Sequence, residues 1–365
     1  MQPTAAARPP RLEFPPAGAV TGVGSLPFTS PAEAVEAIAA CSPEVPFWPQ
    51  LPRLSDRESI VGQGLDALSP WLEPRAQGYG YQVKQGSIDR VVEALHRSDG
   101  ALTTANAVGF AAFQTALAAG RFESACAVKG QIEGPVTLAA YLFHQGRPFL
   151  ADPALFAAVA FHVSQILCWQ IERLAVGGAP VLLFVDEPAL CLPAPSGGLV
   201  SEERRLAAVA AVLDGIRARG AYAGLHCCAA SPLGRMRRAQ PDILSFDAHQ
   251  GLEEFFRDPD ARAFVRDGGR VAYGLIPTWQ DLAAVDPRAL FARWLTLASV
   301  AGDPEVFAAR SMVTATCGLG LVRPETVVES FAKARAVGAL LRALAEASEP
   351  DGEDQATVWA AGAGS

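Results

Sequence analysis

Residues 221–228, A-Y-A-G-L-H-C-C, end in one imidazole and two thiols. The short apolar run after Gly220 predicts a buried strand. Because side chains alternate between the two faces of a strand, His226 and Cys228 should project to one side and Cys227 to the other. Imidazole and thiolate both suit zinc, and a catalytic zinc needs three protein ligands and an open position. The pair therefore indicates two zinc ligands, and a buried histidine beside inert core thiols is the alternative.

Seven other apolar runs predict the remaining strands. They cover residues 19–24, 45–48, 125–132, 181–185, 243–246, 270–275 and 312–316. Helical patterns separate most of them, such as the one that begins with the capping sequence Ser30-Pro31 and the one over residues 324–346. Strands that alternate with helices predict an α/β fold, a (β/α)8 TIM barrel, with a doubly wound sheet as the alternative. Residues 51–119 have a mixed pattern and are predicted to form an insertion between strands 2 and 3.

Chemically capable side chains stand where these predicted strands end. They are Ser25, Gln50, Gln131, Glu133, Asp186, His226, Cys228, Asp247 and Cys317. In a barrel the carboxyl ends of the strands converge on one face, where the active site lies. Cys317 follows the eighth strand and is therefore the candidate for the third zinc ligand.

Composition limits the possible functions. The 365 residues are 50% hydrophobic and 19% charged, with a formal net charge of -8. No stretch has eighteen uninterrupted apolar residues, no block is rich in Lys and Arg, and the first ten residues lack the apolar region of a signal peptide. The seven cysteines are an odd number without framework spacing, which favours core residues or metal ligands over disulfides. We expect a cytoplasmic globular protein with small-molecule or protein partners, and no nucleic acid or membrane as a main partner.

The ends of the chain differ in composition from the middle. Residues 1–17 are rich in proline and alanine and are predicted to be a flexible arm. Residues 347–365 have tail composition and are predicted to be disordered. A single TIM-barrel domain is expected to occupy residues 18–346.

Five short motifs follow one another in a recognisable order. They are G-S-L-P at 24–27, G-P-V-T at 134–137, D-E-P-A-L at 186–190, H-C-C at 226–228 and C-G-L at 317–319. In this order and spacing the chain resembles the C-terminal catalytic barrel of cobalamin-independent methionine synthase. It is similar, more loosely, to the zinc methyltransferases that move methyl groups from corrinoids to coenzyme M. The resemblance covers about residues 21–344.

The resemblance implies roles for particular residues. It implies a zinc ion (Zn²⁺) held by His226, Cys228 and Cys317, and a methyltransferase-like barrel. Ser25 and Asp186 would hold an amino-acid substrate, and Gln131 and Glu133 are further substrate-binding candidates. Asp186 and Glu187 of the D-E-P motif are the predicted catalytic carboxyls. Asp247 stands where the family has a zinc-linked glutamate, and because its side chain is one methylene shorter, its ligation of zinc stays open.

The expected chemistry is activation of a thiol. A free thiol is mostly protonated at neutral pH, whereas methyl transfer needs a thiolate nucleophile. Zinc with an open position can bind the sulfur and stabilise its charge. We therefore expect a methyltransferase that acts on homocysteine, as in methionine biosynthesis, or on a related thiol.

The methyl donor and two other functions are left open by the sequence. A single barrel without a second half favours a methylcobamide, free or on a corrinoid protein, over methyltetrahydrofolate. A decarboxylase like uroporphyrinogen decarboxylase would share the barrel, but it would need arginines near the first strand, and only Arg8 and Arg11 precede Ser25. A non-catalytic metal-binding or ligand-binding barrel is the remaining alternative.

Overall fold

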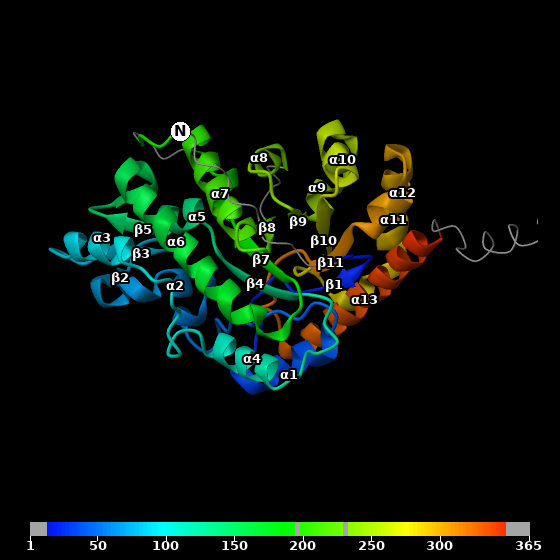
Figure 1. Cartoon of the computed structure of the whole chain (residues 1–365), viewed down its shortest axis with the longest axis horizontal. Coiled ribbons are helices and arrows are strands. Elements are labelled where there is room, and N and C mark those ends of the chain that lie inside the picture. Colours follow the sequence, from blue (N-terminus) through cyan, green and yellow to red (C-terminus); the bar gives the residue numbers. More distant parts are fainter. Residues whose placement is uncertain (1–12, 194–197, 229–232, 348–365) are drawn as a thin grey trace, which may run out of the picture.

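A computed structural model describes residues 13–193, 198–228 and 233–347. Most of the predicted arm and nearly all of the predicted tail, residues 1–12 and 348–365, lie outside the described residues. The central element is a curled sheet of seven parallel strands (Figure 1). Its order is β1 (Ala19–Val20), β11 (Ser311–Ala315), β10 (Arg270–Ile276), β9 (Ile243–Asp247), β8 (Tyr222–Cys227), β7 (Val181–Asp186) and β4 (Val128–Glu133).

The predicted second strand, residues 45–48, did not form a continuous strand. Residues 45–50 lie between β1 and β4 but make only isolated bridges, Phe47 to Lys129 and Ser25 to Gln50. Pro46 and Pro49 lack a backbone N–H, so this segment cannot build a continuous ladder of hydrogen bonds. The α/β class and the parallel sheet are as expected, whereas an eight-stranded TIM barrel is not confirmed. We call residues 45–50 the seam segment.

The sheet has an apolar inner core at the amino ends of its strands. A separate buried cluster gathers apolar side chains from the strands of the sheet and from residues next to them. Its members are Phe14, Ala19, Val45, Ala127, Leu182, Phe184, Tyr222, Ile243, Ala272 and Met312. Because side chains on a strand alternate, the residues two and four positions further along point to the same inner side. On β7 this sequence runs Leu182, Phe184, Asp186, and on β8 it runs Tyr222, Gly224, His226. The inner face therefore changes from apolar to polar toward the carboxyl ends.

Helices cover the outer face of the sheet (Figure 1). Asp152 caps α6 (Pro153–Leu174) by accepting from the backbone of Ala154 and Leu155, and Ser30 caps α1 (Pro31–Cys41) in the predicted way. The last helix, α13 (Pro324–Glu346), has the predicted bounds. The other α-helices are α2 (Ile60–Gly64), α3 (Ile88–His96), α4 (Val108–Ala118), α5 (Pro135–Tyr141), α7 (Glu202–Arg217), α8 (Leu233–Arg238), α9 (Ala248–Arg257), α10 (Pro259–Arg266), α11 (Pro287–Ala301) and α12 (Pro304–Ala309).

The insertion adds a small second sheet. Its strands β2 (Leu72–Pro74) and β3 (Tyr81–Val83) form an antiparallel pair, and β5 (Leu142–His144) and β6 (Arg147–Pro148) extend the sheet. In Figure 1 this sheet and α3 lie at one end of the molecule, opposite α11 to α13. Helix α2 of the insertion contacts β4 of the main sheet.

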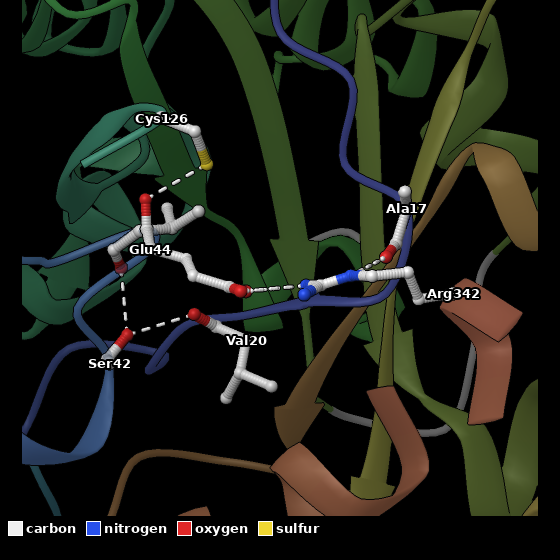
Figure 2. A network of polar contacts seen from close by, with 7 residues as sticks. Ala17, Val20, Ser42, Glu44, Cys126 and Arg342 are labelled. Carbon is white, nitrogen blue, oxygen red and sulfur yellow. Dashed lines mark hydrogen bonds and ion pairs between the residues drawn. The ribbon is translucent and has the colours of Figure 1, made fainter. Parts of the chain in front are cut away.

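A polar network fastens the amino-terminal side of the sheet (Figure 2). Arg342 of α13 donates to both carboxylate oxygens of Glu44 at 2.8 Å and to the carbonyl of Ala17 at 3.1 Å. The Ser42 hydroxyl donates to the carbonyls of Val20 and Val45, at 2.9 Å each. These contacts tie the last helix and the loop before the seam segment to β1, at the face of such folds that serves stability.

In the described part of the chain, one helix is long and apolar enough, by length and composition, to cross a membrane. It covers Pro153–Gly177, and half of its most apolar window is buried inside the protein. Core helices of globular proteins meet the same criteria, and here α6 packs against β4, α5 and α7.

Candidate functional site

A cavity of about 270 Å³ opens at the carboxyl ends of the strands. Most of the polar residues predicted from the sequence line it, namely Ser25, Gln50, Glu133, Asp186, His226, Cys228 and Cys317. Three of them lie on the strands β4, β7 and β8, and Gln50 belongs to the seam segment. Ser25, Cys228 and Cys317 lie in the segments that follow β1, β8 and β11. The expected convergence of strand ends on one site is therefore present.

His226 presents one free ring nitrogen to this region. Its Nδ1 lies 2.9 Å from the hydroxyl of Ser245 on β9, while its Nε2 is buried without a hydrogen-bond partner in the described part of the chain. Burial lowers the pKa of His226 to about 3, and the positive charge of Lys129 adds to this effect. The ring is therefore neutral at physiological pH. With Nδ1–H donating to Ser245, Nε2 carries the lone pair that a metal ligand needs.

The two candidate cysteines meet directly. The thiol of Cys228, which follows β8, hydrogen-bonds to the sulfur of Cys317. This bond lowers the pKa of Cys317 to about 7, and the same bond, with burial, raises the pKa of Cys228. Cys227, in contrast, is fully buried in the core between the sheet and the helices, as alternation predicts.

The donor atoms suit zinc in type, although they are not gathered into a metal-binding cluster. Within residues 13–193, 198–228 and 233–347, no group of three or more His, Cys, Asp or Glu side chains is close enough to hold a metal ion. The unpartnered Nε2 of His226 and the adjoining sulfurs of Cys228 and Cys317 are nevertheless one imidazole and two thiols on one cavity. This is a donor set that zinc uses in catalytic sites. The residues therefore fit the ion that the family resemblance implies.

Asp247 has another contact pattern. Its carboxylate caps α9, with one oxygen 2.8 Å from the backbone nitrogen of His249 and the other 2.8 Å from Nε2 of Gln250. It does not line the cavity. Since both oxygens already accept hydrogen bonds, the geometry offers no support for Asp247 as a fourth ligand.

Two carboxyl groups face the cavity with unused oxygens. Glu133 and Asp186 are paired in register on β4 and β7, and each leaves one buried oxygen without a hydrogen-bond partner among the described residues. Burial raises the pKa of Asp186 to about 8, against the opposing charge of Lys129, and it raises the pKa of Glu133 well above its usual range. Buried polar atoms are rarely left unpaired, so these oxygens indicate a ligand that donates hydrogen bonds, such as an amine.

Glu187, a predicted catalytic carboxyl, does not line this cavity. Its carboxyl group accepts from the backbone of Val136 and Thr137 at 2.9 Å and from the Thr137 hydroxyl at 2.6 Å, and so caps the amino end of α5. A Cβ on Gly134 would come within 2.3 Å of Oε1 of Glu187. The G-P-V-T and D-E-P motifs are thus joined by a structural contact in which both oxygens of Glu187 accept hydrogen bonds.

Gln131 lies below the cavity rather than on its wall. It is fully buried, its Nε2 donates to the carbonyl of Trp48 at 3.0 Å, and its Oε1 accepts from Nζ of Lys129 at 2.8 Å. Its predicted role in substrate binding therefore has no direct geometric support.

Ser25 stands against the C-G-L motif. A Cβ on Gly318 would lie 2.0 Å from Oγ of Ser25, and the backbone nitrogen of Leu319 donates to the Ser25 carbonyl at 2.9 Å. Only glycine allows this approach. The contact brings the hydroxyl of Ser25 beside Cys317 on the cavity wall.

Some residues of the site were missed. Ser59 and Ile60, from the insertion, also line the cavity, and nothing in their sequence context indicates this. Ser245 and Lys129 could have been found, because alternation along β9 and β4 places them on the same inner face as Asp247 and Glu133. Their apolar neighbours hid them in the sequence.

Comparison with known proteins gives a likeness of fold. No family model matches the sequence, and no curated protein sequence matches it. A methyltransferase from Methanosarcina mazei superposes with a TM-score of 0.52 at 13% identity, over 89% of this chain and 94% of that chain. A B12-independent methionine synthase from Shewanella sp. W3-18-1, in complex with selenomethionine, gives a TM-score of 0.44 at 16% identity over 60% of this chain. The chain spans 63% of that synthase chain.

Proposed function

We propose that this protein is a zinc-dependent methyltransferase that transfers a methyl group to the thiol of homocysteine or a related amino-acid thiol. The observation that carries the proposal is the donor set of one cavity. Among the described residues, it holds an unpartnered imidazole nitrogen and two adjoining sulfurs beside two carboxyls that each have one unpaired oxygen. The fold it shares with a methyltransferase supports the same class of reaction.

His226, Cys228 and Cys317 would hold the zinc. Once bound, the ion would stabilise the substrate sulfur as a thiolate, which is the nucleophilic form. Ser245 orients the ring of His226, so that Nε2 rather than Nδ1 faces the cavity. The hydrogen bond between the two cysteines keeps their sulfurs adjacent before the metal enters.

The carboxyls and Ser25 would bind the amino-acid part of the substrate. The unpaired oxygens of Glu133 and Asp186 can accept hydrogen bonds from an ammonium group, and binding would satisfy both. The hydroxyl of Ser25, on the wall beside Gly318, can donate to a carboxylate. These contacts would hold the thiol in one orientation, so that the methyl donor approaches it in line.

Two methyl donors are compatible with this site. A methylcobamide, free or carried by a corrinoid protein, and methyltetrahydrofolate can each give a methyl group to a thiolate. In both reactions a sulfur–carbon bond forms while the bond between the methyl group and the donor breaks. Parallel assays with each donor distinguish the two reactions.

The test is formation of methionine by the zinc-loaded protein. L-homocysteine is supplied in parallel with methylcobalamin or with methyltetrahydrofolate, and methionine is measured by mass spectrometry. We expect turnover with one of the donors and loss of turnover after chelation of zinc. Turnover that survives chelation would refute the role of the metal, and no methionine with either donor would refute homocysteine as the acceptor.

A decarboxylase is less well supported. Anionic tetrapyrrole carboxylates would need cationic partners, but no arginine is among the described residues that line the cavity. Release of carbon dioxide from uroporphyrinogen by the metal-free protein would favour that reading.

A further inference from the structure

Lys129 is a buried cation to which the proposed reaction assigns no task. It is on β4, two positions before Gln131, and only 2% of it is exposed. Its ammonium nitrogen lies 4.9 Å from the ring centre of Phe184 and 5.9 Å from that of Phe47. A buried amine is costly to desolvate, and burial lowers the pKa of Lys129 to about 7. An apolar side chain would fill this space at a lower cost, which indicates that the hydrogen bonds of the amine do something specific here.

The hydrogen bonds of Lys129 cross the gap between β1 and β4. Nζ donates to the carbonyl of Val23 at 2.7 Å and to Oε1 of Gln131 at 2.8 Å. Nε2 of Gln131 in turn donates to the carbonyl of Trp48 in the seam segment. One ammonium group thereby links β4, the seam segment and the chain that follows β1, at the place where no continuous strand closes the sheet.

The chain after β1 is pressed closely onto this network. A Cβ on Gly24 would lie 2.8 Å from Cδ of Gln131 and from Oε1 of Gln50, and a Cβ on Gly22 would lie 2.2 Å from the ring of Phe47. Residues 22–24 therefore have little freedom once Lys129 holds Val23. Ser25 follows directly, and its neighbours Gly24 and Leu26 bond to the backbone of Gln50 in the seam segment.

We propose that Lys129 is a positioning residue that clamps residues 23–25 and the seam segment to β4, and so sets where Ser25 and Gln50 stand relative to Glu133 and Asp186. The clamp itself is independent of the proposed function. Its effect on substrate binding rests on that function, because it assumes that an amino acid spans the cavity from Ser25 to the two carboxyls.

The test replaces Lys129 with methionine, which keeps the unbranched stem and removes the ammonium group. Lys333→Met is the matched control, because Lys333 also donates to a carbonyl, that of Val285 at 2.9 Å, but does not line the cavity. Amide hydrogen exchange is followed at two N–H groups that bond across the seam. Leu26 donates to the carbonyl of Gln50, and Gln50 donates to the carbonyl of Gly24. The N–H of Val271, which donates to the carbonyl of Arg310 elsewhere in the sheet, is the reference. Binding of L-homocysteine to the zinc-loaded protein and zinc content are measured in parallel.

In Lys129→Met we expect amide exchange to be at least about tenfold faster at Leu26 and Gln50 and unchanged at Val271. Homocysteine should bind about tenfold more weakly, and zinc should be retained. Lys333→Met should leave exchange at all three amides, homocysteine binding and zinc content as in the wild type. Unchanged exchange at the seam, or equal acceleration at Val271, would overturn the clamp. If wild-type protein does not bind homocysteine, the proposed function fails while the exchange data still decide on the clamp.

A second variant covers the case that Lys129→Met does not fold. Gln131→Leu removes the bonds to Lys129 and to Trp48 but leaves the ammonium paired with Val23. It should accelerate exchange at Gln50 relative to Val271, and equal rates at the two amides would contradict the network.

Discussion

Asp186 and Glu187 are neighbours in the chain, yet their carboxyl groups have opposite surroundings. Asp186 lines the cavity with an unpaired oxygen, whereas Glu187 caps α5 with both of its oxygens. Alternation along β7 separates them, because consecutive side chains at the end of a strand point to opposite faces. A motif such as D-E-P thus identifies a strand end, and geometry decides which carboxyl meets the ligand.

The role of Asp186 can be tested by one substitution. Asp186→Asn removes a carboxyl that a bound ammonium group would favour in its ionised form. The variant loses that charge-assisted hydrogen bond, and we expect homocysteine to bind about 10-fold to 150-fold more weakly. Zinc content should stay constant. Isothermal titration measures the affinity, with Asp260→Asn, on an 82% exposed side chain, as the control. Unchanged affinity would leave Asp186 with a structural role.

Ser245 gives a second prediction at the scale of single residues. It holds Nδ1 of His226 at 2.9 Å, so Ser245→Ala should free the ring to turn and weaken zinc binding about 10-fold to 100-fold. Competition with a chelator of known affinity measures this change. Ser164→Ala, which removes a hydroxyl bonded only to its own helix, is the control. Equal zinc affinity in both variants would mean that Ser245 does not orient the ligand.

Among the elements, strands and helices were predicted better than the seam and the insertion. The uninterrupted apolar run of residues 181–185 and the capping sequence Ser30-Pro31 define those elements locally, and β7 and the start of α1 agree with the prediction. Residues 45–50 form only isolated bridges because Pro46 and Pro49 have no backbone N–H to donate. A hydrophobic pattern does not show this. The approach of Ser59 and Ile60 to the cavity depends on contacts distant in sequence, so no local signal predicts it.

α6 holds the segment that includes Ile60 in place through a buried histidine. Nε2 of His162 lies 2.8 Å from the carbonyl of Gly64 in α2, and Nδ1 lies 2.6 Å from the hydroxyl of Ser98. Burial lowers the pKa of His162 below its usual value of 6.5. Between the lowered pKa and 6.5 the unfolded chain binds more protons than the folded one. The stabilisation is therefore complete above pH 6.5 and is lost as the pH falls toward the lower pKa.

This predicts a pH-dependent loss of stability. As the pH falls below 6.5, the free energy of unfolding should decrease more steeply in the wild type than in His162→Gln, by up to about 1.4 kcal/mol per pH unit. Urea unfolding at several pH values measures this difference. His96→Gln, on an exposed position at the end of α3, should behave like the wild type. Parallel curves for His162→Gln and the wild type would contradict the assignment.

In the whole molecule, stabilising contacts and the candidate site lie at opposite ends of the strands of the curled sheet. The apolar inner core and the Arg342 network lie toward the amino ends of the strands, and the unpaired carboxyls, the imidazole and the thiols lie at the carboxyl ends. Motif order alone predicted that His226, Cys228 and Cys317 would share one site, because parallel strands all end at the same face. It did not predict how the sheet closes, which depends on Lys129 and the seam segment.

The central claim is that these three residues hold a catalytic zinc, and metal content of the purified protein tests it most directly. Elemental analysis should find about one zinc per chain in the wild type and in Cys227→Ser, whose altered side chain faces the outer core. Cys228→Ser and Cys317→Ser should lose most of the zinc while their circular dichroism spectra stay unchanged. Full retention of zinc in both of these variants would contradict the account.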